Sequence, residues 1–195
     1  GTSNFVAGVN AGDSITSGGN NNTLIGDNAG TTITTASNNT AVGSRAMIAN
    51  TSGAENTAVG EQALTVNTTG ANNTAIGKAA LLLNTTASYN TVVGSSAMYN
   101  NTTGSNNVAV GFQSLQQNTT AYQNTAVGTT ALKSTTTGLD NTGVGFSAMF
   151  ANTTGYNNTA VGKSSLAANT TGAQNTSVGK NALAANTTAS YNTAV

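Results

Sequence analysis

The sequence contains no proline, cysteine, histidine or tryptophan, and only 5% of its 195 residues are charged. Without histidine or cysteine, the chain lacks an imidazole base, a thiolate nucleophile and the usual ligands of zinc and iron–sulfur sites. Five basic residues balance five acidic ones, so no electrostatic footprint for nucleic acid or anionic lipid is expected. No apolar run approaches the ~18 residues of a membrane span. We therefore expect no cofactor, no metal, no nucleic-acid partner and no membrane insertion.

The dominant feature of the sequence is a 17-residue repeat with the consensus N-T-A-V-G-x-x-A-L-x-x-N-T-T-G-x-x, numbered here as positions 1 to 17. Residues 1–21 resemble a degenerate first copy, and residues 22–195 form one continuous array of tandem copies. Because the sequence stops inside a copy, we expect it to be a segment of a longer array. The copies begin at Asn22, Asn39, Asn56, Asn73, Asn90, Asn107, Asn124, Asn141, Asn158, Asn175 and Asn192.

A repeat of this length is too short for a helix–turn–helix unit and suits one coil of a β-solenoid. Asn-Thr-Ala-Val predicts a short strand, and Asn-Thr-Thr predicts a further one. Positions 6 to 11, as in residues 61–66, predict either a helical turn or a second short strand, because six residues are too few for periodicity to decide. The expected fold is all-β, a β-solenoid (β-roll) of stacked 17-residue coils.

Position 5 is glycine in every copy that reaches it, which predicts a sharp turn, with a positive φ as one option. The structural turn residues are Gly43, Gly60, Gly77, Gly94, Gly111, Gly128, Gly145, Gly162 and Gly179. Stacking places equal positions in columns, and the apolar columns at positions 4 and 9 are expected to fill the interior. The expected core residues are Val42, Val59, Ile76, Val93, Val110, Val127, Val144, Val161, Val178, Leu64, Leu81, Leu115, Leu132, Leu166 and Leu183.

Asparagine at positions 1 and 12 predicts ladders of side-chain amides at the corners of the stack. The position-12 asparagines also begin N-x-S/T sequons, which makes them candidates for glycan attachment. The ladder is the favoured interpretation, because a chain so rich in Asn and Thr contains sequons by chance. The candidates are Asn50, Asn67, Asn84, Asn101, Asn118, Asn152, Asn169 and Asn186.

A single coil buries too little apolar surface to be stable alone, so neighbouring coils and a second apolar surface are required. Alanine recurs at positions 3 and 8, as in Ala58 and Ala63, and small residues let strands of different chains approach closely. We therefore expect a homo-oligomer, preferably a trimer, with these alanine columns near its axis.

The few charged residues show no catalytic arrangement. Asp13, Asp27, Glu55, Glu61 and Asp140 are isolated along the repeat, so each is interpreted as a solvated surface charge. Lys163 and Lys180 occupy position 6 of adjacent copies, where an exposed, screened column is expected. No catalytic residue is assigned, and the chain is not expected to be an enzyme.

The motif N-T-A-V-G-x-x-A-L, as in residues 56–64 and 175–183, resembles two groups of repeats. One is the head of trimeric autotransporter adhesins, a left-handed β-roll of N-S-V-A-I-G coils that are usually shorter. The other is the repeat region of bacteriophage tail fibres that carry a C-terminal self-cleaving chaperone, which residues 22–30 and 34–39 resemble especially. The resemblance implies a non-enzymatic, extracellular fibre, a stalk or head segment that holds a binding tip away from a virion or cell.

Two other functions are compatible with the sequence. A bacterial surface adhesin or glycan-coated fibril would bind a host-surface or glycan receptor through lateral aromatic residues, of which Tyr99, Phe112, Phe146 and Phe150 are the candidates. More remotely, regular threonine columns at positions 13 and 14 are also found in ice-binding solenoids, although here they adjoin Asn corners and Gly turns.

Overall fold

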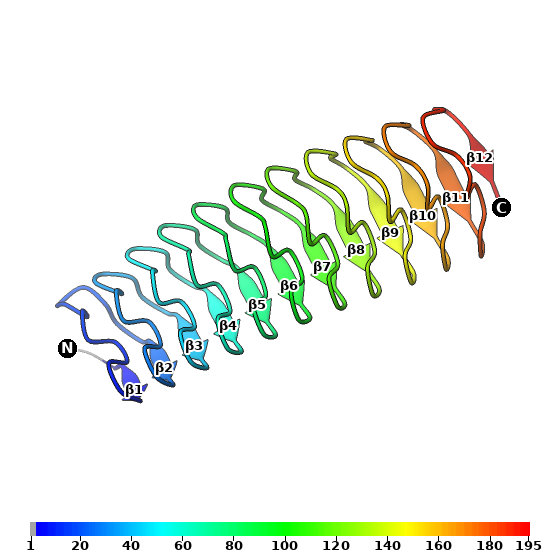
Figure 1. Cartoon of the computed structure of the whole chain (residues 1–195). Helices are drawn as coiled ribbons and strands as arrows, with labels where there is room; N and C mark the ends of the chain where they lie inside the picture. The colour runs from blue at the N-terminus through cyan, green and yellow to red at the C-terminus, as the bar shows by residue number, and fades with distance from the viewer. Residues whose placement is uncertain (1–2) are drawn as a thin grey trace.

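The computed structural model describes residues 3–195, which form one parallel sheet of twelve short strands in chain order, β1 to β12 (Figure 1). Within these residues there is no helix, and hence none that could cross a bilayer. The expected all-β solenoid is confirmed. The strands are β1 (Phe5–Ala7), β2 (Thr23–Ile25), β3 (Thr40–Val42), β4 (Thr57–Val59), β5 (Thr74–Ile76), β6 (Thr91–Val93), β7 (Val108–Val110), β8 (Thr125–Val127), β9 (Thr142–Val144), β10 (Thr159–Val161), β11 (Thr176–Val178) and β12 (Thr193–Ala194).

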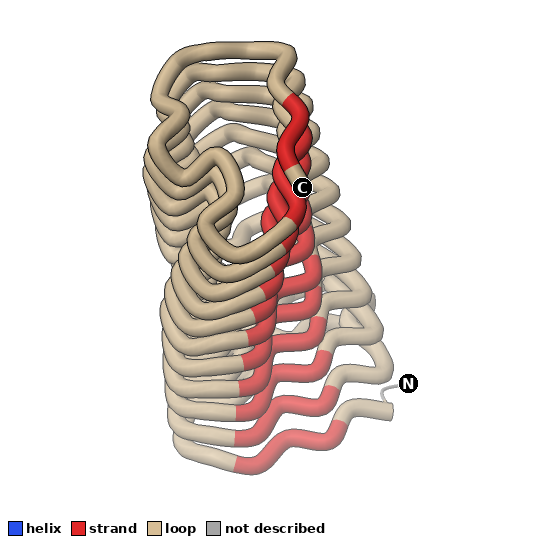
Figure 2. Tube along the Cα trace, turned by 90° about the vertical axis from the view of Figure 1, so that its right-hand side faces the viewer, coloured by secondary structure: helices blue, strands red, loops and turns tan. Residues whose placement is uncertain are grey.

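Each strand pairs with the next at a constant offset of 17 residues, so that Thr57 lies opposite Thr74 and Val59 opposite Ile76. Only the first pairing differs: Phe5 lies opposite Thr23, an offset of 18. One coil therefore follows another along a single axis, with the strands on one side and the loops on the other (Figure 2).

The loops are also bonded from coil to coil, although they are not strands. The Leu64 N–H donates to the Ala80 carbonyl at 3.0 Å, and the Thr68 N–H donates to the Thr85 carbonyl at 2.8 Å. The predicted strand at Asn-Thr-Thr and the helical turn or second strand at positions 6 to 11 are therefore both wrong. The hydrogen bonds expected of a stack are nevertheless present around the whole coil.

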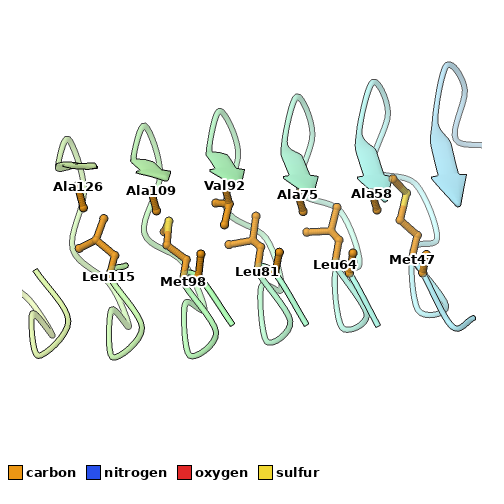
Figure 3. Close-up of a cluster of buried hydrophobic side chains, with 14 of the residues drawn as sticks. Met47, Ala58, Leu64, Ala75, Leu81, Val92, Met98, Ala109, Leu115 and Ala126 are labelled. Atoms are coloured by element: carbon orange, nitrogen blue, oxygen red, sulfur yellow. The ribbon is translucent and has the colours of Figure 1, made fainter. Parts of the chain in front are cut away.

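The core is built from positions 3, 8 and 9, as in Ala58, Ala63 and Leu64, each with 0% exposure. Leucine and methionine side chains of the loop point towards the small residues of the strands (Figure 3). Of the leucines expected in the interior, Leu64, Leu81, Leu115, Leu132 and Leu166 are fully buried, and Leu183 in the last coil packs against them partly exposed.

The expected interior position of the position-4 column is wrong. A strand turns alternate side chains to opposite faces, and the buried face takes Ala, which leaves Thr and Val outside. Ile76, Val161 and Val178 are 38–39% exposed. The other outward residues of this set, all intermediate in burial, are Val42, Val59, Val93, Val110, Val127 and Val144. The alanine columns at positions 3 and 8 cannot line an axis between chains either, because alanines such as Ala58 and Ala63 are fully buried inside their own chain.

Left-handed residues explain why positions 8 and 9 both face inward. In a regular strand these neighbours would point to opposite sides. Here position 7 (Gln62, φ 61°) and position 9 (Leu64, φ 52°) are both left-handed, and this turns Ala63 and Leu64 towards the same core. Such a conformation costs about 1–2 kcal/mol per residue, which burial of a leucine side chain offsets.

The first full copy, residues 22–38, builds the same core with a large and a small side chain exchanged between two positions. Leu24 stands at position 3, where most other coils have Ala, and Gly30 stands at position 9, where the later coils have Leu or Met. A Cβ on Gly30 would lie 2.8 Å from Leu24 Cδ2. The large side chain thus enters from the strand instead of the loop, and the filled volume is kept.

The position-5 glycines have φ between 125° and 141° from Gly26 to Gly179, a region that is essentially restricted to glycine. At Gly94 an added Cβ would also lie 2.4 Å from the Gly111 carbonyl oxygen of the next coil. Both the conformation and the close approach therefore require glycine.

We predict that Gly94→Ala destabilises the protein by about 3 kcal/mol or more, because strain and a backbone clash act together. The matched control is Gly143→Ala, at position 3 of β9, where most other coils carry alanine and φ is not positive; its change should stay within about 1 kcal/mol. Denaturant unfolding monitored by circular dichroism measures both. Equal losses in the two variants would contradict the special role of position 5.

Candidate functional site

The most elaborate polar structure in the chain is a buried ladder of asparagine side chains at position 12. Asn101, fully buried, donates from Nδ2 to Asn84 Oδ1 at 2.8 Å and to the Gly104 carbonyl at 3.0 Å. Its Oδ1 accepts from Asn118 Nδ2 at 2.7 Å. An amide with asparagine at the same position on both sides therefore bonds the preceding coil, the following coil and its own turn.

A second ladder runs along position 1. The backbone N–H and the Nδ2 of Asn73 both donate to Asn56 Oδ1, at 2.9 and 3.1 Å. The Ala87 carbonyl at position 15 accepts from Asn73 Nδ2 at 2.8 Å and from Asn84 Nδ2 at 3.0 Å. The two ladders thus converge on one carbonyl per coil and fix the turn between them.

The position-12 ladder is interrupted at Thr135. The Thr135 hydroxyl and the Asn118 Oδ1 are buried without a hydrogen-bond partner, and Asn152 Nδ2 retains only its bond to the Gly155 carbonyl at 3.1 Å. A buried polar atom without a partner costs about 1–3 kcal/mol, so this coil is a weak point of the stack.

The folded coil hides the sequons of the position-12 column. Asn50, Asn67, Asn84, Asn101, Asn118, Asn152 and Asn169 are all 0% exposed, and Asn186 in the last coil is half-buried. Their Nδ2 atoms, to which a sugar would be joined, donate hydrogen bonds inside the stack. Glycan attachment there stays a prediction that requires modification before the coils close.

Among residues 3–195, the carboxylates form no catalytic arrangement. All five carboxylates are exposed; Glu61 pairs with Lys78 at 3.0 Å, and Asp27 accepts from Asn28 at 2.8 Å. In this part of the chain there is no pocket and no group of three potential metal ligands.

The aromatic side chains do lie on the surface. Phe112, Phe146 and Phe150 are 49%, 53% and 39% exposed, and Tyr99 is half-buried. Two lysines lie over the rings: Lys163 Nζ is 5.6 Å from the Phe146 centroid and Lys133 Nζ is 5.9 Å from that of Phe150. These residues form the most chemically distinctive part of the exterior.

The two threonine columns, at positions 13 and 14, differ in whether their hydroxyls form hydrogen bonds within the stack. At position 13 the hydroxyl donates to the carbonyl of the next copy, as from Thr68 to Thr85 at 3.1 Å and from Thr102 to Thr119 at 3.0 Å. These hydroxyls are therefore used within the stack. Ice binding by positions 13 and 14 stays a prediction, with only position 14 fully presented to water.

The geometry defines the class of protein as a tandem-repeat β-solenoid of about eleven coils. In comparisons with known proteins, the chain matches no family, no curated sequence and no solved structure.

We predict that Thr135→Asn stabilises the protein by about 1–3 kcal/mol, because the new amide supplies the partners missing at Asn118 and Asn152. The control is Thr136→Asn, one residue later, where the threonine hydroxyl donates to the Thr153 carbonyl at 3.3 Å and the site is partly exposed; no gain is expected there. Thermal unfolding of both variants beside the unchanged protein measures the effect. A lower midpoint for Thr135→Asn would show that the interruption is not a defect.

Proposed function

We propose that this chain is a non-enzymatic structural segment of an extracellular fibre, of the kind that forms the shaft or head of a phage tail fibre. The observation that carries the proposal is the unbroken one-coil register from β2 to β12. At about 4.8 Å per strand, the twelve strands span roughly 53 Å along one axis. A stack whose neighbours bond all around the coil transmits force along its length, as a spacer must.

The outward sheet face is proposed as the surface on which copies of the chain associate. No residue of the twelve strands is charged, although the chain carries ten charges elsewhere. The face presents Thr and Val columns about 10 Å wide, or roughly 500 Å² per chain. Three such faces turned to a common axis would together bury about 1,500 Å², which is about 500 Å² for each of the three pairs of chains. The expected trimer is thus retained as a proposal, with this face in place of the alanine columns.

A bacterial surface adhesin that binds through its side is the second candidate. It is favoured by the exposed rings of Phe112, Phe146 and Phe150, because exposed aromatic residues are enriched where proteins bind partners. In this alternative the solenoid itself carries the receptor site, whereas a spacer carries it at the tip.

We predict that Val93→Lys with Val127→Lys prevents association while the coil stays folded, because outward lysines can extend into water but repel one another across an interface. The control places the same charges two residues later in the same coils, as Ser95→Lys with Thr129→Lys, at exposed positions outside the sheet face. Sedimentation velocity and circular dichroism measure mass and fold. A folded monomer for the unchanged chain at micromolar concentration would contradict the proposal.

The fibre function itself is tested on the intact particle. Antibodies raised against the chain should decorate thin projections of a virion or cell in electron micrographs, spaced along the shaft. Labelling of a virion would support a tail fibre, and labelling of a cell surface would support an adhesin. Labelling confined to the cell interior would exclude both.

A further inference from the structure

One column on the edge of the solenoid combines exposed rings and lysines in consecutive coils. We define the position-6 ridge as Phe112, Thr129, Phe146, Lys163 and Lys180, all exposed. Because equal positions of neighbouring coils lie about 4.8 Å apart, the ridge is straight and about 19 Å long. It directly follows the turn that ends each strand.

Along the whole array, position 6 carries charged residues in adjacent coils twice. One pair has opposite signs and the other has like signs. In the third and fourth full coils, Glu61 and Lys78 occupy position 6 in succession and form an ion pair at 3.0 Å. Lys163 and Lys180 have the same relation, but within residues 3–195 neither has a carboxylate within salt-bridge distance. Like charges at equal positions of neighbouring coils repel each other, so an anion that contacts both ammonium groups would relieve this repulsion.

The rings beside the lysines indicate which kind of anion fits. Phe112 and Phe146 expose about half of their surface and stand two coils apart, with Thr129 between them. An aromatic face is electron-rich and stacks against the C–H face of a sugar ring. Lys163 Nζ lies over the Phe146 ring, 5.6 Å from its centroid, so that a cation and an aromatic ring are direct neighbours in the ridge.

We propose that the position-6 ridge binds an acidic polysaccharide, with sugar rings on Phe112 and Phe146 and carboxylates on Lys163 and Lys180. The unbranched chain would lie parallel to the solenoid axis. A convex, straight edge suits a linear polymer, whereas peptide recognition uses grooves, pockets or strand addition. The proposal adds a lateral ligand to the proposed fibre function and rests on the surface location that this function implies.

Calorimetric titration of the full chain with polygalacturonate at low ionic strength tests the proposal. The unchanged protein should bind saturably, and binding should weaken as salt is raised to ~0.5 M. Lys163→Gln with Lys180→Gln, and separately Phe112→Ser with Phe146→Ser, should each weaken binding by about tenfold or more.

The matched control is Tyr122→Ser with Tyr156→Ser, which removes exposed rings at position 16 of the same two coils and should leave binding unchanged. Equal binding of neutral dextran, tighter binding of oligothymidylate, or equal loss in the tyrosine variant would overturn the proposal. Sedimentation of the same samples measures assembly independently of sugar binding. If the unchanged protein forms an intact assembly but binds no sugar, the ridge alone is refuted, and a monomer that still binds the sugar refutes only the assembled fibre.

Discussion

The structure depends on the hydrogen bond that an asparagine side chain makes to the asparagine of the neighbouring coil. A side-chain amide has both donors and an acceptor, so one residue can bond the coil before it, the coil after it and its own turn, as Asn101 does. Only a stack with identical register satisfies all of these atoms at once. The composition follows from this requirement, because asparagine occupies two corners of most coils and charged residues in such columns would repel one another.

The small core is sufficient because each coil is enclosed by its neighbours. Within one coil, Ala58, Ala63 and Leu64 supply most of the buried apolar surface, and a lone coil would expose both of its flat faces. Stability of such an array is a sum of weak internal terms and strong contacts between neighbours. The strained residues at positions 7 and 9 are held by these contacts, since the N–H groups of Gln62 and Leu64 bond carbonyls in the adjacent coils.

The sequence predicts the all-β solenoid and its period, because one-residue displacements would break columns that repeat through the whole chain. It does not decide which side of the strand faces inward. A three-residue strand of Thr, Ala and Val is compatible with either orientation, and the decision comes from left-handed residues such as Gln62 and Leu64. The exchange of Leu24 and Gly30 was the available signal, because it shows that positions 3 and 9 share one volume.

Predictions for the candidate site succeed and fail for similar reasons. Exposure of Phe112 and Phe146 follows from their variable positions in the repeat. An Asn-Thr-Thr motif, in contrast, is compatible both with a sequon and with a ladder, and the ladder is seen only in the buried hydrogen bonds of Asn84 and its neighbours. The missing partners of Asn118 and Thr135 depend on three coils together, which a motif confined to one copy cannot reveal.

The first coil has one residue more than the others, and the place of this residue shows where a coil can be lengthened. Thr16 bonds Thr34, an offset of 18, whereas Asn20 bonds Ser37 Oγ, an offset of 17, so the additional residue is absorbed at the turn of Gly18 and Gly19. This corner is the one place in that coil where the chain is lengthened without displacing a column. Gene duplication can therefore extend the array in whole coils, each adding about 4.8 Å of reach, while the one extra residue of the first coil is accommodated at this turn.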